Sequence, residues 1–409
     1  MGLSAFTMSD EERSTEVSMD ELAALVETAG GEAVAQVLQS RAAPDPRSFV
    51  GEGKVREVKE LLEANDCSLA VFDNELSPSQ MRVLSEELGV KVLDRSGLIL
   101  DIFAQRARTR EGKLQVELAQ YKYLLPRLTG MWKHLVSQTA AGGKSPIGIR
   151  GPGETQLEAD RRHIRRKIQK LEQELKDVRK VRSVQRARRE KNDLPVAALV
   201  GYTNAGKSTL LNCLAGAQIQ TGDRLFDTLD TTTRRMKLDE TQEILISDTV
   251  GFIRKLPHHL IEAFKATLEE LAYADILLHV IDLSNPDWEE QAAVVDSLIR
   301  QLGAEQTPCI RVFNKCDLYF GELPRGHNVV CISALTGEGK EDLLKKISEI
   351  LGEEKRRVRL RLPYDKGYLL ERLHREASVR SVEYGEEQIS VDAVIGPKLW
   401  GMVREYAVE

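Results

Sequence analysis

The stretch VAALVGYTNAGKST, residues 196–209, restricts the possible folds of this 409-residue chain more than any other segment. An apolar run predicts a buried strand, and the residues from Thr209 to Ala215 predict a helix. The turn between them has the spacing G-x-x-x-x-G-K-[ST], from Gly201 to Ser208. Backbone N–H groups of such a turn point inward at a helix N-terminus and hold phosphate oxygens. The spacing therefore predicts a strand–turn–helix unit that binds a nucleoside triphosphate.

Four residues are expected to handle the phosphates and a metal ion. Lys207 should reach the β- and γ-phosphates, and the Ser208 hydroxyl should ligate Mg²⁺. DTVG, residues 248–251, follows the apolar run EILIS, where a second strand should end beside the turn. Asp248 fits the carboxylate that holds Mg²⁺ through a water, and the Gly251 N–H can sense a γ-phosphate.

Two further motifs predict the base. NKCD, residues 314–317, follows the run CIRVF, and an Asp317 carboxylate would accept hydrogen bonds from guanine N1–H and N2–H₂. Adenine would leave that carboxylate unpaired, which costs on the order of 10⁴-fold in affinity. The Lys315 stem can cover the base, and in SAL, residues 333–335, the Ala334 N–H would meet guanine O6. Four motifs in this order, at strand ends of a doubly wound sheet, predict a GTPase domain.

The segment GDRLFDTLDTTTRR, residues 222–235, occupies the position of a first switch. A threonine there should complete Mg²⁺ coordination and order the loop around the γ-phosphate. The spacing leaves four candidates open, which are Thr228, Thr231, Thr232 and Thr233. After Gly251 comes Phe252, where many GTPases place a water-orienting glutamine, so intrinsic hydrolysis should be slow and a partner should complete the geometry.

Bulk composition restricts the class of protein. No apolar run approaches the ~18–20 residues of a membrane span, and the N-terminus lacks the basic-then-apolar layout of a secretory signal. The five cysteines show no metal-binding spacing. We therefore expect a cytoplasmic protein of two to four domains. The net charge is −6, yet 150–191 holds 15 Lys/Arg against 7 Asp/Glu, so this segment carries +8 and the rest −14.

The chain is expected to divide into a flexible leader (1–20), an N-terminal α/β domain (21–192), a GTPase domain (193–353) and a small C-terminal α+β domain (354–409). The last part of the N-terminal domain, about 110–192, is expected to be an antiparallel helical hairpin. No recognisable catalytic pattern occurs up to about residue 108 or in the C-terminal domain.

Within the N-terminal domain, short apolar runs predict strands over 33–40, 69–73 and 90–94. Amphipathic patterns predict helices over 54–65 and 77–89, the second of which opens on a Ser-Pro cap. In the C-terminal domain, strands RRVRLRL and QISVDAVI should accompany helices YLLERLHREA and KLWGMVREY.

Two apolar stripes of period 3.5 predict the hairpin and its packing seam. One stripe comprises Leu114, Leu118, Tyr121, Leu125 and Leu128, and the other Ile164, Ile168, Leu171, Leu175 and Val178. The connecting segment, about 129–153, carries Met131, Trp132 and Leu135 among lysines and glycines, which suits a tip that orders against a partner. Thr155 and Glu158 form a capping box for the second helix.

Four quoted stretches together resemble the HflX family of ribosome-associated GTPases, which belong to the translation-factor class. They are GPGETQLEADRR (151–162), GYTNAGKST (201–209), LFDTLDTTTRR (225–235) and DTVGFIRKLPHHL (248–260). The resemblance extends from about residue 30 to the end. It implies binding to the large ribosomal subunit, an N-terminal region that reaches toward the peptidyl-transferase centre, and splitting or rescue of stalled ribosomes.

The resemblance also assigns roles in the first switch. Its F-x-T-L pattern falls on Phe226, Thr228 and Leu229, which makes Thr228 the expected Mg²⁺ ligand. A hydrophobic residue at Phe252 agrees with the family pattern, whereas Thr231 departs from it by replacing a proline.

The expected site is therefore as follows. Lys207, Thr228 and Gly251 act in hydrolysis, and Ser208 and Thr228 ligate Mg²⁺. The nucleotide-binding set is Gly201, Tyr202, Thr203, Asn204, Ala205, Gly206, Lys207, Ser208, Thr209, Phe226, Asp227, Thr228, Leu229, Asp230, Asp248, Thr249, Val250, Gly251, Asn314, Lys315, Cys316, Asp317, Ser333, Ala334 and Leu335.

The expected partners are GTP or GDP and the large ribosomal subunit with its RNA. Arginines of the basic hairpin would contact phosphates, and Trp132 could stack on a loop base. We expect a monomer without a membrane span. The alternative function is a GTP-gated ribosome-assembly scaffold in which turnover is incidental, and ribosome-stimulated hydrolysis would separate the two.

Overall fold

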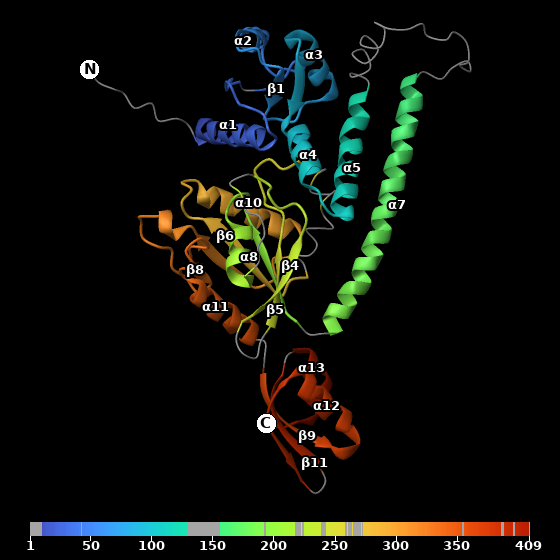
Figure 1. The fold of residues 1–409 in the computed structure, drawn as a ribbon, viewed down its shortest axis with the longest axis vertical. Coiled ribbons are helices and arrows are strands. Elements are labelled where there is room, and N and C mark those ends of the chain that lie inside the picture. The colour runs from blue at the N-terminus through green and yellow to red at the C-terminus, as the bar shows by residue number, and fades with distance from the viewer. Residues whose placement is uncertain are drawn as a thin grey trace.

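The structure is a computed structural model that describes residues 10–41, 43–128, 156–191, 194–216, 222, 225–238, 243–257, 273–353, 356–385, 388–395 and 397–408, together with residues 260, 264 and 271. From the N-terminus these form an α/β region, a helical pair, a central sheet with its helices, and a C-terminal sheet with two helices (Figure 1). The expected multidomain α/β fold is confirmed.

The N-terminal region is a small parallel α/β unit. It contains α1 (Asp10–Thr28), α2 (Glu52–Ala64), β1 (Leu69–Phe72), α3 (Pro78–Leu88), β2 (Lys91–Asp94) and α4 (Arg95–Arg106). Strands β1 and β2 pair in parallel, as the strand–helix alternation predicts. Helix α3 begins where expected, because the Ser77 side chain accepts from the Gln80 N–H and the Gln80 side chain accepts from the Ser77 N–H.

Two expectations for this region are wrong. Residues 10–20 of the predicted flexible leader lie in α1, where Ser18, Leu22 and Leu25 are buried against the rest of the protein. Residues 33–40 form no strand, and Val34 and Leu38 are 51% and 41% exposed. A strand needs a neighbouring strand for its backbone groups, but the described backbone of 33–40 makes no ladder. Apolar alternation alone does not supply that neighbour.

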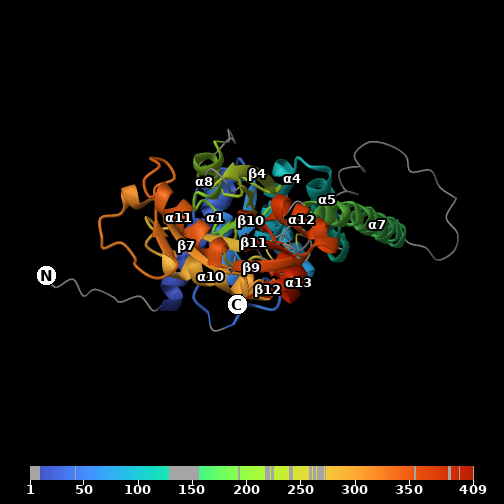
Figure 2. The ribbon, with the colours of Figure 1, turned by 90° about the horizontal axis from the view of Figure 1, so that it is seen from below.

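The helical pair consists of α5 (Arg110–Leu124), the short η1 (Leu125–Arg127) and α7 (Gln156–Lys191). Leu114 and Leu118 of α5 pack on Leu171 and Leu175 of α7, so the two apolar stripes meet as predicted. The helices run antiparallel (Figure 1), and Figure 2 shows them together at one side of the molecule. The predicted tip with Trp132 and the Thr155 cap lie outside the described residues.

Asp94 joins this helical pair to the α/β unit. Its buried carboxylate caps α4 by accepting from the Gly97 N–H at 2.8 Å. It also accepts from the Tyr123 hydroxyl at 2.7 Å and from Arg127 at 3.1 Å. A buried carboxylate with several donors is satisfied, so this contact fixes the hairpin base relative to β2.

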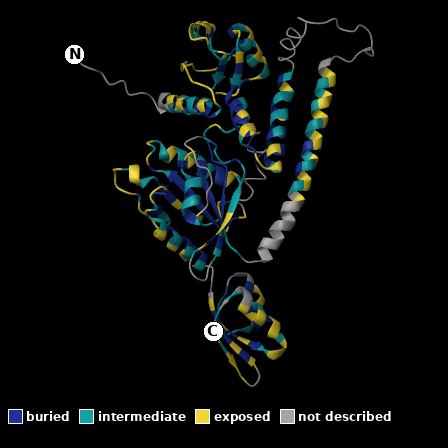
Figure 3. Ribbon diagram, in the orientation of Figure 1, coloured by how far each residue is buried: buried dark blue, intermediate teal, exposed yellow. Residues whose placement is uncertain are grey.

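The central sheet has the strand order β4-β5-β3-β6-β7-β8. Its strands are β3 (Val196–Gly201), β4 (Thr232–Lys237), β5 (Glu243–Asp248), β6 (Ile276–Asp282), β7 (Cys309–Asn314) and β8 (Val329–Cys331). All pairs are parallel except β4 with β5, and the strand residues are mostly buried (Figure 3). This is the doubly wound sheet that the motifs predict, with the antiparallel β4 as an addition.

Helices cover both faces of that sheet. Ala197 and Leu199 face α8 (Lys207–Ala215) and α11 (Lys340–Glu353), whereas Ala198 and Val200 share a cluster with α10 (Trp288–Gln301). The cluster that contains Ala198 and Val200 also contains Leu25, Phe103 and other residues of the N-terminal region. One apolar core is therefore shared between the N-terminal region and the central sheet.

The C-terminal module, residues 356–408, has the order β9 (Arg356–Pro363), η3 (Tyr364–Lys366), α12 (Gly367–Glu376), β10 (Ser378–Tyr384), β11 (Gln388–Ile395), α13 (Pro397–Val403), η4 (Arg404–Tyr406) and β12 (Ala407–Val408). Its antiparallel sheet runs β10-β11-β9-β12. The segments predicted as strands and helices take those forms, and β10 and β12 are additions.

Candidate functional site

The phosphate turn, residues 201–208, joins the buried end of β3 to the first turn of α8. Two glycines are required by close contacts. A Cβ at Gly201 would lie 2.3 Å from the Val280 carbonyl oxygen of the neighbouring strand. A Cβ at Gly206, whose φ is 90°, would lie 2.2 Å from Asn314 Nδ2. The backbone of the turn therefore passes closer to β6 and β7 than any side chain would allow.

Three oxygen-bearing side chains meet beside the turn. The Ser208 hydroxyl donates to Asp248 Oδ2 at 2.7 Å and lies 2.7 Å from the Thr228 hydroxyl. Burial raises the pKa of Asp248, and its Oδ1 has no hydrogen-bond partner among the described residues. Two hydroxyls and a buried, half-satisfied carboxylate are a hard oxygen set of the kind Mg²⁺ prefers. The residues present therefore fit such an ion.

Of the four threonines that the spacing left open, Thr228 is the one whose hydroxyl meets Ser208. Thr233 instead lies in β4 with its hydroxyl 3.3 Å from that of Ser247. Thr232 is also part of β4, and Thr231 precedes it. The geometry thus favours the same residue that the family resemblance assigns.

Lys207 is 6% exposed and lies folded over the turn. Its ammonium donates to the carbonyl oxygens of Gly201 at 3.2 Å and Tyr202 at 2.7 Å. Burial lowers the pKa of Lys207 to about 8. A Cβ at Gly251 would lie 3.0 Å from this ammonium, so the Gly251 backbone stands at the end of the lysine.

A cross-link of hydrogen bonds positions the base-side motifs. Asn314 donates from Nδ2 to the Ala205 carbonyl at 2.9 Å and accepts at Oδ1 from the Ala334 N–H at 2.9 Å. One buried amide therefore ties the phosphate turn to both base motifs. Lys315 pairs with Asp282 at 2.6 Å, and Asp317 is exposed. Asp317 can thus accept from a ligand.

Most of the predicted residues come together around the turn. An open cavity is lined by Thr203, Asn204, Gly206, Lys207, Ser208, Thr209, Gly222, Phe226, Asp227, Thr228, Thr249 and Gly251, of which only Gly222 was absent from the predicted set. At the base side, the Ser333 hydroxyl accepts a hydrogen bond from the Thr336 N–H, and Leu335 is 82% exposed. The Cys316 thiol donates to the Phe313 carbonyl, and burial raises its pKa to about 12.

Four predicted nucleotide-binding residues direct their side chains elsewhere. Leu229 and Val250 lie in the core shared with the N-terminal region. Asp230 accepts from the Arg108 and Thr109 N–H groups and from the Thr109 hydroxyl, at the start of α5. The Tyr202 hydroxyl donates to Glu21 of α1. Their position in a motif did not reveal this second neighbour, and their role at the nucleotide stays a prediction.

Several described contacts hold the first switch segment, residues 222–235, against the N-terminal region. The Leu225 N–H donates to the Thr28 hydroxyl of α1 at 3.4 Å. The Phe226 ring meets Phe103 of α4 edge-on at 4.8 Å. Asp227 pairs with Arg106 at 3.3 Å, and Asp230 contacts the start of α5 as described above. This segment therefore contacts Ser208 on one side and the N-terminal region on the other.

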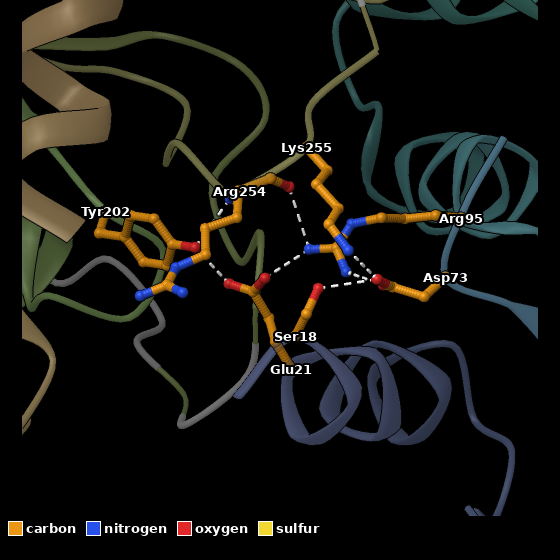
Figure 4. A network of polar contacts seen from close by, with 7 residues as sticks. All are labelled: Ser18, Glu21, Asp73, Arg95, Tyr202, Arg254 and Lys255. Carbon is orange, nitrogen blue, oxygen red and sulfur yellow. Dashed lines mark hydrogen bonds and ion pairs between the residues drawn. The ribbon is translucent and has the colours of Figure 1, made fainter. Parts of the chain in front are cut away.

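The second switch segment, residues 248–257, is fastened by a buried polar network centred on Arg95 (Figure 4). Arg95 is 2% exposed and donates to Asp73 at 2.6 Å, to Glu21, and to the Arg254 carbonyl oxygen at 3.0 Å. Lys255 reaches Asp73, which also accepts from Ser18. The Tyr202 hydroxyl accepts from the Arg254 N–H at 2.7 Å.

The charges in this network compensate one another. Burial alone would raise the pKa of Asp73, but Lys255, Arg95 and Ser18 together lower it. Burial and the neighbouring Glu21 carboxylate raise the pKa of Tyr202, so its hydroxyl remains a donor. Tyr202 belongs to the phosphate-turn motif, but no sequence pattern marked its partners in the N-terminal region, because isolated polar residues have no spacing signal. They were found only when the fold placed α1, β1, α4 and the switch together.

Phe252 is held inside the shared core. It is 1% exposed, its N–H donates to Gly201, and its carbonyl accepts from Thr203. The position after Gly251 therefore carries a buried ring and no side chain that could orient a water.

Comparisons with known proteins agree with the motifs. Residues 16–104 match the family model described as GTP-binding GTPase N-terminal, 106–189 match GTP-binding GTPase Middle Region, and 196–315 match 50S ribosome-binding GTPase. The chain is 46% identical to GTPase HflX of Caldanaerobacter subterraneus subsp. tengcongensis over 96% of this chain and 91% of that protein. It is 45% identical to GTPase HflX of Escherichia coli over 91% and 88% of the two chains.

A solved structure of a GTP-binding protein from Sulfolobus solfataricus, in complex with GDP, is 26% identical with a TM-score of 0.43, covering 81% of this chain and 94% of that one. Among the helices of the described residues, none has the length and apolar character to cross a membrane.

We predict that affinity for GDP falls as pH rises above about 8. Phosphates favour protonated Lys207, so binding must take up a proton once the free lysine, with its pKa of about 8, has lost it. The expected slope approaches ~tenfold in Kd per pH unit. Fluorescence titration of labelled GDP between pH 7 and pH 9 measures it. Lys207→Met should remove the slope, and a wild-type Kd that is constant over this range would contradict the prediction.

We predict that Arg95→Met loosens both α1 and the second switch segment. The change leaves the Glu21 and Asp73 carboxylates buried with fewer donors, at a local cost of about 3–5 kcal/mol. Amide hydrogen exchange should accelerate in residues 15–28 and 251–256. Arg254→Met is the matched control, because among the described residues the Arg254 side chain pairs with Glu290, which is 63% exposed, so its loss leaves no buried carboxylate without a donor. Equal exchange in both variants would refute the role of Arg95.

Proposed function

Because the chain belongs to the HflX family of GTPases, we propose that it binds the large ribosomal subunit in its GTP form and splits or rescues stalled ribosomes. The protein is a GTPase, which converts GTP and water to GDP and phosphate. The observation that supports a ribosomal partner is the match of residues 196–315 to the model described as 50S ribosome-binding GTPase. As part of the same proposal, it acts as a cytoplasmic monomer.

The nucleotide roles follow from the geometry around the phosphate turn. Backbone N–H groups of 202–208 would hold the phosphates, and Lys207 would leave the Gly201 and Tyr202 carbonyls to reach the β- and γ-phosphates. Asp317 would accept from the guanine N1–H and N2–H₂, and the Ala334 N–H would face the base edge. Gly251 would report the γ-phosphate to the second switch segment.

Mg²⁺ would be held by the Ser208 and Thr228 hydroxyls, with the free Oδ1 of Asp248 accepting from a bound water. The ion would neutralise charge on the β- and γ-phosphate oxygens. Ser208 and Asp248 lie at the ends of the buried elements α8 and β5, whereas Thr228 belongs to the first switch segment. Ordering of Thr228 would therefore couple the nucleotide to the contacts of Phe226, Asp227 and Asp230.

Ribosomal stimulation is supported by the residue that follows Gly251. Phe252 is buried and fixed by two backbone hydrogen bonds, so no side chain at this position can orient the attacking water. A slow intrinsic rate is expected, and a group supplied by the ribosome would complete the site.

Helix α7 supports contact with ribosomal RNA. Arg162, Arg165 and Arg166 are exposed on the described part of the helix, away from the seam formed by Leu171 and Leu175. Such a row can neutralise backbone phosphates. The alternative function is a GTP-gated assembly scaffold, which needs the same contacts but no stimulated turnover.

We predict that Asp317→Asn lowers GTP affinity on the order of 10²–10⁴-fold and raises affinity for xanthosine triphosphate. The amide can no longer accept from both guanine donors, whereas it can donate to the additional carbonyl oxygen of xanthine. Competition binding with the two triphosphates measures the exchange. Asp317→Ala, which should lose GTP without gaining the other nucleotide, is the control. Unchanged preference in Asp317→Asn would remove Asp317 from the base site.

We predict that purified large subunits raise GTP turnover at least ~10-fold over the protein alone. Reversing Arg162, Arg165 and Arg166 to Glu should abolish both this stimulation and co-sedimentation with the subunit, because the phosphate contacts become repulsive. Intrinsic turnover of the variant should remain normal. Binding without stimulation would favour the scaffold, and intrinsic turnover of several per second would contradict the need for a partner.

A further inference from the structure

The C-terminal module has one covered and one open sheet face. Alternate residues of β9 and β11, such as Leu360 and Val391, pack under α12 and α13 in a core of their own. The other residues of the same strands are exposed or half-buried, and no described element lies over them. The chain order is β-α-β-β-α-β with strand order β10-β11-β9-β12, so β9 and β11 form the middle of the open face.

A row of arginines follows the centre of that face. Arg357, Arg359 and Arg361 occupy every second position of β9 and are all exposed. Successive members are about 6.6 Å apart, since a strand rises about 3.3 Å per residue. Nucleic-acid phosphates along one strand are spaced on a similar scale, so adjacent arginines of this row can contact adjacent phosphates.

Neighbouring charged residues hold one end of the row in place and leave the net charge of the group positive. Arg357 makes two hydrogen bonds to Asp392 of β11, at 3.1 and 2.6 Å. The Arg357 hydrogen bond is the largest cause that lowers the pKa of Asp392, with the positive charges of Arg359 and Arg380 also contributing. Three arginines, Arg357, Arg359 and Arg380, thus act on the Asp392 carboxylate. The fourth, Arg361, and the acidic Glu383 of β10 both lie opposite Ser390 of β11. The net charge of the group is +2.

Exposed tyrosines gather at the end of the sheet to which the row leads. Tyr364 follows β9 directly, and its hydroxyl donates to the Gly385 carbonyl at 2.6 Å, in the turn between β10 and β11. Tyr384 stands at the end of β10, and Tyr368 lies one helical turn after Tyr364. Their exposures are 49% for Tyr364, 60% for Tyr368 and 69% for Tyr384. Tyr384 lies opposite Ile389, which belongs to the core under the helices, so its ring is on the other side of the sheet from the arginine row. Tyr368 belongs to α12, which covers that same side.

We propose that the open sheet face of the C-terminal module binds an RNA strand, whose successive phosphates contact Arg359 and Arg361. The hydrogen bonds to Asp392 fix the position of Arg357 at the start of the row. This inference extends the proposed function and rests on it for the choice of RNA over DNA. It assigns to the C-terminal module a contact separate from that of α7.

The full-length protein with a 4-thiouridine-substituted single-stranded RNA tests the proposal. After photocrosslinking, mass spectrometry should place crosslinks in residues 357–384. Arg359→Gln with Arg361→Gln should reduce these crosslinks at least ~tenfold and lower the salt slope of binding by about 1.4, for two lost phosphate contacts to a single strand. Crosslinks to α7 should be unchanged. Arg82→Gln with Arg325→Gln removes two exposed arginines elsewhere and is the charge-matched control.

Tyr384→Ala is a second control, because Tyr384 lies on the covered side of the sheet. This variant should keep the crosslinks to β9. Absence of crosslinks in 357–384, or crosslinks unaffected by the arginine pair, would overturn the proposal. Because naked RNA is used, these outcomes do not depend on stimulation of turnover by large subunits.

Discussion

The buried guanidinium of Arg95 is the interaction on which the arrangement of the N-terminal half depends. A charge can be buried only where partners replace its water, and here they come from α1, from the end of β1 and from the second switch segment. None of these segments can move far without leaving a charge unpaired. This network therefore holds the second switch segment against α1 and the end of β1.

The nucleotide site shares this constraint through its first switch segment. Thr228 meets Ser208 on one side, while Phe226 and Asp230, two residues away in either direction, meet α4 and α5. Because this loop is held at both sides, a change in its position at Ser208 also changes its contacts with α4 and α5. The N-terminal region is accordingly placed to respond to whether the γ-phosphate is present, which suits a protein whose proposed task lies at the end of that region.

Charge is distributed so that an acidic protein can approach a polyanion. The whole chain carries −6, yet the exposed arginines of α7 and of β9 form two separate basic surfaces. In both, the basic residues alternate with apolar ones that face a core, at helical period in α7 and at period two in β9. The positive surface is thus a consequence of amphipathic folding, and it lies on the faces that packing leaves open.

What the sequence determined by itself was the local chemistry. The spacing from Gly201 to Ser208, the Asp317 position and the heptad stripes predicted the central sheet, the base and the hairpin seam, because each depends on residues close together in the chain. The tertiary structure decided the rest. It turned residues 10–20 from a predicted leader into a packed helix, left 33–40 without a strand partner, and directed the Tyr202 and Asp230 side chains to the N-terminal region. Each of these outcomes depends on a neighbour more than fifty residues distant or on the lack of one, and no local pattern records which distant segment will lie alongside.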